Sequence, residues 1–288
     1  MVSRLIFAVL ASLAAIPGLP AAAQVTPPGI GNDTRDQVQN LMRILQMDQV
    51  IEVMQAEGLD YGATLRTEMF PEKAGAGWSA AVATIYDPQR MTAEFETALA
   101  REMARTPEAF AEADRFFGDD RGQRIIMLEI EARRALMDEA TEALAREAAD
   151  RLPTEQAARH EALKQFVAAN DLIELNVMGA LNANLAFYRG LAAGGAFGDA
   201  MTESDMLAEV WGQEADVRAE TESWLWSYLG LAYQPLSDED LQAYYDFSRS
   251  EAGRALNHAV FAAFDAVFVR ISEDLGRAAA RMMQGEDI

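Results

Sequence analysis

Residues 247–275, FSRSEAGRALNHAVFAAFDAVFVRISEDL, decide the fold. Ser250 is a good helix N-cap, and the apolar residues after it recur every three or four positions. That spacing places them on one face of an α-helix. The stretch therefore predicts a long amphipathic helix whose apolar face packs into a core, through Leu256, Val260, Phe264, Val267, Phe268, Ile271 and Leu275.

The same helical spacing recurs outward from this segment, in residues 38–54 and 125–144. No sustained alternation of apolar and polar residues indicates a strand. Helix starts are expected at Thr106-Pro107, at Pro153 and at Ser237. Breaks are expected at Gly58–Gly77, Gly194–Asp199 and Ala232–Leu236. The chain is therefore predicted to be all-α, a multi-helix bundle.

An internal repeat indicates that the bundle has two similar helical halves. Phe116-Phe-Gly-Asp-Asp-Arg-Gly122 aligns with Phe247-Ser-Arg-Ser-Glu-Ala-Gly253 at an offset of 131 residues. Upstream, Asp48-Gln-Val-Ile-Glu-Val53 resembles Asn170-Asp-Leu-Ile-Glu-Leu175 at an offset of 122. We expect an internal duplication, with residues 33–151 as the first helical repeat and 152–288 as the second. Such halves can pack about a pseudo-twofold axis. Chance similarity between two acidic helical stretches is the alternative.

The repeated turn motif consists of Phe116 and Gly122 in the first half and Phe247, Ser250 and Gly253 in the second. Ser250, like the aspartates of the first copy, is a good N-cap for the helix that follows. The two phenylalanines are expected to anchor the preceding short helix in the core. The glycines are expected to permit close helix packing. This structural role is favoured over a binding site.

The stretch Leu241…Phe247-Ser-Arg-Ser250-Glu-Ala-Gly253-Arg254 resembles the C-terminal signature of the bacterial domain of unknown function 2059 family. The family pattern is a short helix, a Phe-Tyr-x-Ser-Pro-x-Gly-like turn and a long amphipathic helix. Ser248 departs from it at the second aromatic position, and Glu251 departs at the proline. The resemblance covers about 50–60 residues of each half. It implies two copies of an exported helical domain and says nothing of its chemistry.

The N-terminus is typical of a targeting segment. Arg4, an apolar run to Ile16 and the small residues Ala21–Ala23 match a cleaved signal peptide at 1–23. The apolar run is shorter than the ~20 residues that a membrane anchor needs. Residues 24–32, rich in proline and glycine, are expected to form a flexible leader. We therefore expect a periplasmic protein without a membrane span in the mature chain.

Charge and composition exclude several function classes. The formal net charge of −22 disfavours nucleic-acid binding, because phosphate backbones are repelled. The chain has no cysteine and two histidines, His160 and His258. No zinc, calcium, phosphate-loop or nucleophile-elbow motif occurs, so neither a metal nor a cofactor is expected. Acidic pairs such as Glu129-x-Glu131 carry little information in a chain with 46 acidic residues. We expect no enzyme.

Aromatic residues gather in the second half, where 15 of the 24 follow Arg151. Trp224, Trp226 and Tyr228 cannot share one helix face, because positions two apart diverge by about 200°. Together with Trp211, they are either buried between helix layers or exposed in a groove for an apolar ligand or partner.

Two functions fit these patterns. The first is a non-catalytic interaction protein that binds a periplasmic protein partner or an apolar segment. The second is a carrier of, or an enzyme on, a small amphiphile held in an aromatic-lined cavity. A closed cavity would favour a carrier, and a flat apolar groove would favour protein binding.

The signal-peptide prediction is tested on the exported protein itself. We expect a mature chain that starts at or near Gln24, since the apolar run is too short to span and no lipidation cysteine follows it. Intact-mass spectrometry of protein from the periplasmic fraction measures this start. A mass that still includes Met1–Ala23 would contradict it.

Overall fold

The computed structural model describes residues 32–71, 76–198 and 200–285. Within these ranges the chain forms thirteen α-helices and no strand, which confirms the predicted all-α class. The predicted signal peptide at 1–23 lies outside the described residues, as does the leader at 24–32 except for its last residue. That residue, Asn32, begins the first helix.

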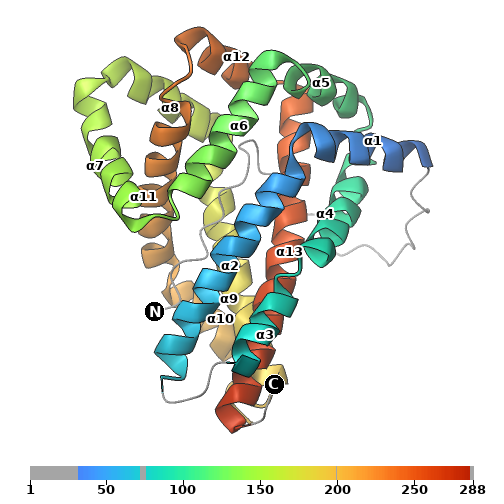
Figure 1. Cartoon of the computed structure of the whole chain (residues 1–288), viewed down its shortest axis with the longest axis vertical. Helices are drawn as coiled ribbons and strands as arrows, with labels where there is room; N and C mark the ends of the chain where they lie inside the picture. Colours follow the sequence, from blue (N-terminus) through green and yellow to red (C-terminus); the bar gives the residue numbers. More distant parts are fainter. Residues whose placement is uncertain (1–31, 72–75, 199, 286–288) are drawn as a thin grey trace.

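The helices follow one another with short connections (Figure 1). In chain order they are α1 (Asn32–Ile44), α2 (Met47–Met69), α3 (Ala76–Ile85), α4 (Pro88–Met103), α5 (Glu108–Phe117), α6 (Asp120–Ala135), α7 (Glu139–Glu155), α8 (Ala157–Ala169), α9 (Leu172–Ala193), α10 (Glu203–Gly212), α11 (Glu214–Tyr233), α12 (Asp238–Arg249) and α13 (Glu251–Gln284).

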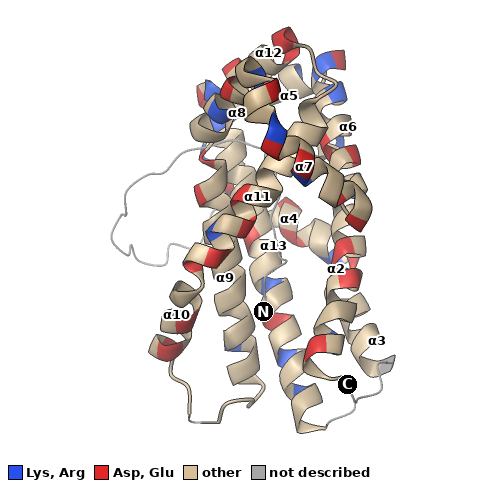
Figure 2. Ribbon diagram, turned by 90° about the vertical axis from the view of Figure 1, so that its left-hand side faces the viewer, with Lys and Arg blue, Asp and Glu red and all other residues tan. Residues whose placement is uncertain are grey.

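The long helix α13 is the centre of the bundle, as its apolar spacing predicts. It packs against α9 along most of its length and also against α4, α5 and α3. Figure 2 shows α13 between α9 on one side and α2 on the other. All seven apolar positions predicted for its core face are buried. Burying this stripe removes a large apolar area from water, which is the main favourable term in folding.

Among the described helices, α13 alone is long and apolar enough to cross a membrane. Of its most apolar window, 61% is buried inside the structure. Its contacts with five other helices account for this apolar character.

The two repeated turns have the same local structure. The Asp119 carboxylate accepts a hydrogen bond from the Gly122 N–H at 2.7 Å, and the Ser250 hydroxyl accepts one from Gly253 at 3.0 Å. A Cβ atom on Gly122 would stand 2.2 Å from the Phe116 carbonyl oxygen. On Gly253 it would stand 2.1 Å from that of Phe247. The expected N-caps are present. Each glycine is required because the backbone at the end of the preceding helix leaves no room for a Cβ atom.

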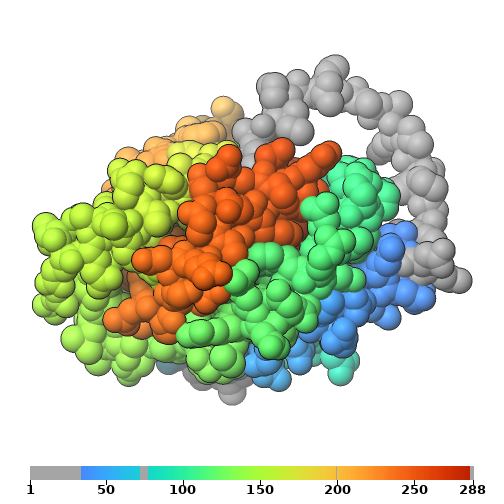
Figure 3. All heavy atoms as spheres, turned by 90° about the horizontal axis from the view of Figure 1, so that it is seen from above, coloured from blue at the N-terminus to red at the C-terminus, as the bar shows by residue number. Residues whose placement is uncertain are grey.

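The two motif phenylalanines also lie against each other. The rings of Phe116 and Phe247 are stacked, with centroids 4.2 Å apart and planes at 9°. This contact joins the α5–α6 turn of the first half to the α12–α13 turn of the second. In Figure 3, α12 (orange) lies beside the α5–α6 segment (green) at this end of the molecule. The two copies of the motif therefore meet in one joint.

Further upstream, two matching backbone conformations occur at a different offset from the predicted one. Gln46 and Asp171, directly before α2 and α9, are the two non-glycine residues with a positive φ among those described, at 52° and 45°. These matching left-handed residues are 125 residues apart, three more than the predicted offset of 122. A shift of three residues is close to one helical turn and preserves the apolar pattern, so sequence spacing did not reveal it. The duplication of the whole halves stays a prediction.

Two predicted boundaries are wrong, and the domain division stays a prediction. The position 151/152 falls inside α7, and buried side chains from both sides of it belong to one main core. Pro153, expected to open a helix, lies in the last turn of α7. The break expected at Gly58–Gly77 begins later than predicted, because α2 continues to Met69 and α3 begins at Ala76. Gly58 serves packing instead, since a Cβ there would stand 2.1 Å from the Tyr86 ring.

The repeated turn gives a direct stability prediction. We expect Gly253→Ala to lower the free energy of unfolding by about 2–3 kcal/mol, because its methyl group meets backbone that must move. Gly230→Ala in α11 is the matched control, since no atom lies within 4 Å of the added Cβ. It should raise stability by up to ~1 kcal/mol through helix propensity. Urea unfolding measures both; equal effects of the two substitutions would contradict the packing argument.

Candidate functional site

A groove of about 820 Å³ opens between the two halves. Its walls come from α2, from α7 and from α11, and its floor from the end of α6, from Tyr86 and from α13. The lining residues are Met54, Glu57, Gly58, Asp60, Tyr61, Thr64, Leu65, Glu68, Tyr86, Arg133, Leu136, Met137, Glu139, Glu142, Arg146, Glu220, Ser223, Trp224 and Phe268. The groove is therefore lined by both aromatic and charged side chains.

Negative charge predominates in the groove. Six carboxylates line it against two guanidinium groups. Arg133 binds Glu57 with two hydrogen bonds of 2.8 and 2.6 Å, and Arg146 pairs with Glu142. Figure 2 shows that acidic residues are also spread over the outside of the helices. The groove thus has more carboxylates than the arginines within it neutralise.

Two tyrosines, Tyr86 and Tyr61, form part of the aromatic lining of the groove. Tyr86 is buried, and its ring fills the space left by the missing side chain of Gly58. Its hydroxyl has no hydrogen-bond partner in the described part of the structure. Tyr61 lines the same wall, where burial and then the Glu68 carboxylate raise its pKa to about 12. Both phenols are therefore neutral at physiological pH and can donate a hydrogen bond.

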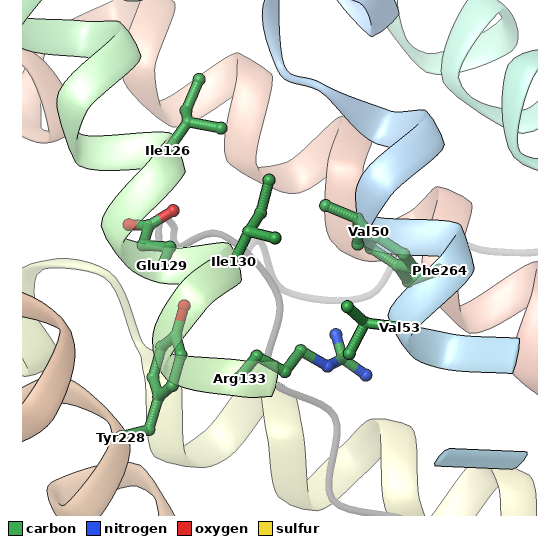
Figure 4. Close-up of a pocket in the computed structure, with 8 residues that line it drawn as sticks. All are labelled: Val50, Val53, Ile126, Glu129, Ile130, Arg133, Tyr228 and Phe264. Carbon is green, nitrogen blue, oxygen red and sulfur yellow. The ribbon is translucent and has the colours of Figure 1, made fainter. Parts of the chain in front are cut away.

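Behind the groove lies a small cavity of about 20 Å³ (Figure 4). This is room for about one water molecule. Arg133 lines both the cavity and the groove, so its side chain separates the two spaces. Most of the cavity wall is apolar and is formed by Val50, Val53, Ile126, Ile130 and Phe264. The polar wall is formed by Glu129, Arg133 and Tyr228.

Glu129 is a carboxyl group inside the core, only 3% exposed. Its Oε1 accepts hydrogen bonds from the hydroxyls of Tyr233 at 2.6 Å and Tyr244 at 3.1 Å. Its Oε2 is buried and has no partner among the described residues. Burial outweighs the two hydrogen bonds and raises the pKa of Glu129 to about 8. The carboxyl group is therefore mostly protonated at neutral pH.

Arg133, one turn after Glu129 on α6, is the second buried charged residue of this helix. Burial alone would lower its pKa, but the Glu57 carboxylate more than offsets this, so the pKa is raised. A buried ion pair of this kind is sensitive, because removing one partner leaves an uncompensated charge. Glu57 is supplied by α2, so the pair fixes α2 to α6 at the bottom of the groove.

The structure separates the four predicted contact residues. Trp224 lines the groove and stacks on Tyr228, with centroids 4.9 Å apart. Tyr228 is buried and lines the inner cavity. Trp226 faces α8, where its ring lies 5.3 Å from that of His160. Trp211 is 56% exposed on α10. Only Trp224 and Tyr228 therefore belong to the candidate site.

Sequence reasoning missed the charged core of the site, although a signal was present. Glu129 and Arg133 continue the buried stripe of α6 that begins with Ile125 and Ile126. A charged residue at an apolar position of the stripe indicates a buried charge that needs a partner. Glu131, paired with Glu129 in the sequence analysis, is exposed, so the two do not form a dyad. Tyr86 and Glu57 had no signal, because their roles depend on contacts between distant helices.

Comparison of the chain with family models, with curated proteins and with solved structures found no match. Among the described residues, no group of three or more His, Asp or Glu side chains is placed to hold a metal ion. The site is thus defined by its own geometry: an acidic, aromatic groove with a buried carboxyl group behind it.

The pKa of Glu129 predicts a specific pH dependence of stability. The folded-state pKa, about 8, lies above the ordinary value of 4.5, so the contribution of this group to stability is present below pH 4.5 and is lost as pH rises toward 8. Glu129→Gln removes this loss of stability, because the glutamine side chain does not ionise. We expect the stability of the variant relative to the wild type to rise by about 4 kcal/mol between pH 5 and pH 8.5.

Urea unfolding at the two pH values measures this difference, in which the titrations common to both proteins cancel. Glu131→Gln, exposed on the same helix, is the matched control and should follow the wild type. A Glu129→Gln curve parallel to the wild-type curve would show that Glu129 is ionised in the folded protein.

Proposed function

We propose that the protein is a non-catalytic binding protein for a small amphiphilic cation, exported to the periplasm as its N-terminal sequence predicts. The single observation that carries this proposal is the lining of the groove. Aromatic rings and carboxylates in excess of the neighbouring arginines line one space of ligand size. An apolar chain or ring with an ammonium or guanidinium group matches both.

Charge supports the cationic part of the ligand. Asp60, Glu68 and Glu139 line the groove and have no ion-pair partner within the described part of the chain. A bound cation relieves the repulsion among these groups, and the overall charge of −22 raises the local concentration of cations. An anionic amphiphile with the same apolar part would be repelled.

The volume and the lining of the groove support an apolar part in the ligand. The volume of about 820 Å³ lies within the range of roughly 300–1,000 Å³ that is typical of small-molecule sites. Trp224, stacked on Tyr228, and Phe268 offer ring surface to an apolar chain. Aromatic faces also attract ammonium and guanidinium groups.

The Tyr86 hydroxyl supplies an independent indication of a ligand. It is buried at the floor of the groove without a hydrogen-bond partner. An unsatisfied buried hydroxyl costs about 1–3 kcal/mol, which a ligand donor can recover. The phenol oxygen can accept a hydrogen bond from an ammonium group.

The groove favours this small-ligand hypothesis over the protein-partner hypothesis, because it is a hollow of molecular size rather than a flat apolar face. A non-catalytic role agrees with the placement of the two histidines. His160 lies against Trp226, and His258 lies 3.9 Å from Glu102, both away from the groove lining. The relation to the domain of unknown function 2059 family remains a proposal that rests on the turn motif.

Isothermal titration calorimetry with two matched probes tests the function. We expect the mature protein to bind decylammonium, at concentrations below micelle formation, at least tenfold more tightly than decyl sulfate, which has the same tail and the opposite charge. Trp224→Ala should weaken binding of the cation about tenfold. Trp226→Ala is the matched control: its ring, on the same helix α11, packs against His160 of α8 outside the groove, so the substitution should leave binding unchanged.

The charge contribution has its own pair of variants. Asp60→Asn with Glu68→Gln should weaken binding of the cation several-fold, whereas Glu52→Gln, exposed on α2 outside the groove, should not. Equal affinity for the two probes, or no binding of either, would contradict the proposal. Binding of a lysine-rich peptide without binding of decylammonium would favour the protein-partner hypothesis instead.

A further inference from the structure

Arg133 lies between two carboxyl groups, one in the groove and one in the cavity. On α6, Glu129 stands four residues before Arg133, which is the spacing and order at which glutamate and arginine normally pair. Arg133 instead binds Glu57 of α2, through Nε at 2.8 Å and a terminal nitrogen at 2.6 Å. Figure 4 shows its side chain extended toward α2 and away from Glu129.

The space between Arg133 and Glu129 is open. Both residues line the cavity of about 20 Å³, whose remaining wall is largely apolar. The Glu129 Oε2 atom is buried and lacks a partner in the described part of the molecule, while Oε1 is held by two tyrosine hydroxyls. The cavity therefore places a second carboxyl group, that of Glu129, beside the same small space that Arg133 lines.

The groups that face Glu129 leave Arg133 as its one nearby cation among the described residues. From α11 come Tyr228 and Tyr233, and from α12 comes Tyr244, all neutral at physiological pH because burial raises each pKa. From α2 comes Glu57, which is already bound to Arg133. With Arg133 turned to Glu57, Glu129 holds its proton.

We infer that Arg133 exchanges partners when the groove binds its cation: the ligand takes over Glu57, and Arg133 turns across the cavity to form an ion pair with Glu129. This inference rests on the proposed function. The O–H bond of the Glu129 carboxyl group breaks, and the proton leaves to water. Before binding, Glu57 and Arg133 form one pair and Glu129 is neutral. Afterwards the ligand pairs with Glu57, and Arg133 pairs with Glu129.

The exchange leaves no buried charge unpaired in either state, which is the condition that a low-dielectric core imposes. One positive charge enters and one proton leaves, so the net charge of the site is conserved. By linkage, affinity for the cation must rise with pH, about tenfold per pH unit below the pKa of Glu129. The pH then regulates the affinity of the groove for the cation, and an acidic environment favours its release.

Calorimetry of decylammonium binding in phosphate and in Tris at pH 7 counts the protons, because the two buffers differ in ionisation enthalpy. We expect close to one proton released per ligand by the wild type. Glu129→Gln should bind the probe with no proton release and with an affinity that is constant from pH 6 to pH 8. Glu131→Gln, exposed on the same helix, should behave as the wild type.

The outcomes separate this inference from the proposed function. Binding by the wild type without proton release, and with affinity independent of pH, overturns the exchange and leaves the proposed function standing. Equal proton release by Glu129→Gln assigns the proton to another group and also overturns it. Absence of any binding by the wild type overturns both. The pH dependence of wild-type affinity tests the exchange even if a variant fails to fold.

Discussion

The burial of one carboxyl group is the constraint on which the rest of the structure depends. Glu129 lies on the core face of α6, where a lone carboxylate is unstable and must be neutral, paired or strongly hydrogen-bonded. The second half of the chain supplies two tyrosine hydroxyls to it, Tyr233 at the end of α11 and Tyr244 in α12. The joint between the halves is therefore built around a polar centre, and the groove opens beside it.

The halves are joined by similar parts. The Phe116–Phe247 stack brings together two turns whose caps and glycines share one local structure. Packing on the two sides also corresponds, because α4 packs on α13 of the other half and α11 packs on α6. A pseudo-twofold duplication would produce this correspondence, and the duplication of the whole halves stays a prediction.

The sequence was sufficient for the fold class, because apolar spacing and capping residues are local signals. Ser237 and Ser250 cap α12 and α13 as expected, and the stripe of α13 forms the core. The end of α2 was misplaced because Gly58 has its role in a contact with Tyr86, a residue distant in sequence. Pro153 was misassigned because proline is favoured in the first turn of a helix, whereas here it stands in the last turn of α7.

The site was less predictable than the fold for the same reason. Trp224 and Tyr228 were selected because they belong to a cluster of aromatic residues in the sequence. Trp224 lines the groove, and Tyr228 lines the cavity behind it. Trp211 and Trp226, selected on the same ground, lie elsewhere, since ring content says nothing of which helix a side chain faces. The polar centre depends on pairings across more than 70 residues, such as Glu57 with Arg133, which one sequence does not display.

The folded protein thus holds Glu129 as a neutral acid beside Arg133, which is bound to Glu57 instead. The most direct test is a carbon-13 NMR titration of the glutamate side-chain carboxyl groups, with the Glu129 signal assigned by its loss in Glu129→Gln. We expect a midpoint near pH 8 for Glu129 in the free protein. In saturating decylammonium we expect a midpoint well below pH 7. A Glu129 signal that titrates near its ordinary value of 4.5 in the free protein would show that the buried carboxyl group is ionised there and would overturn this interpretation.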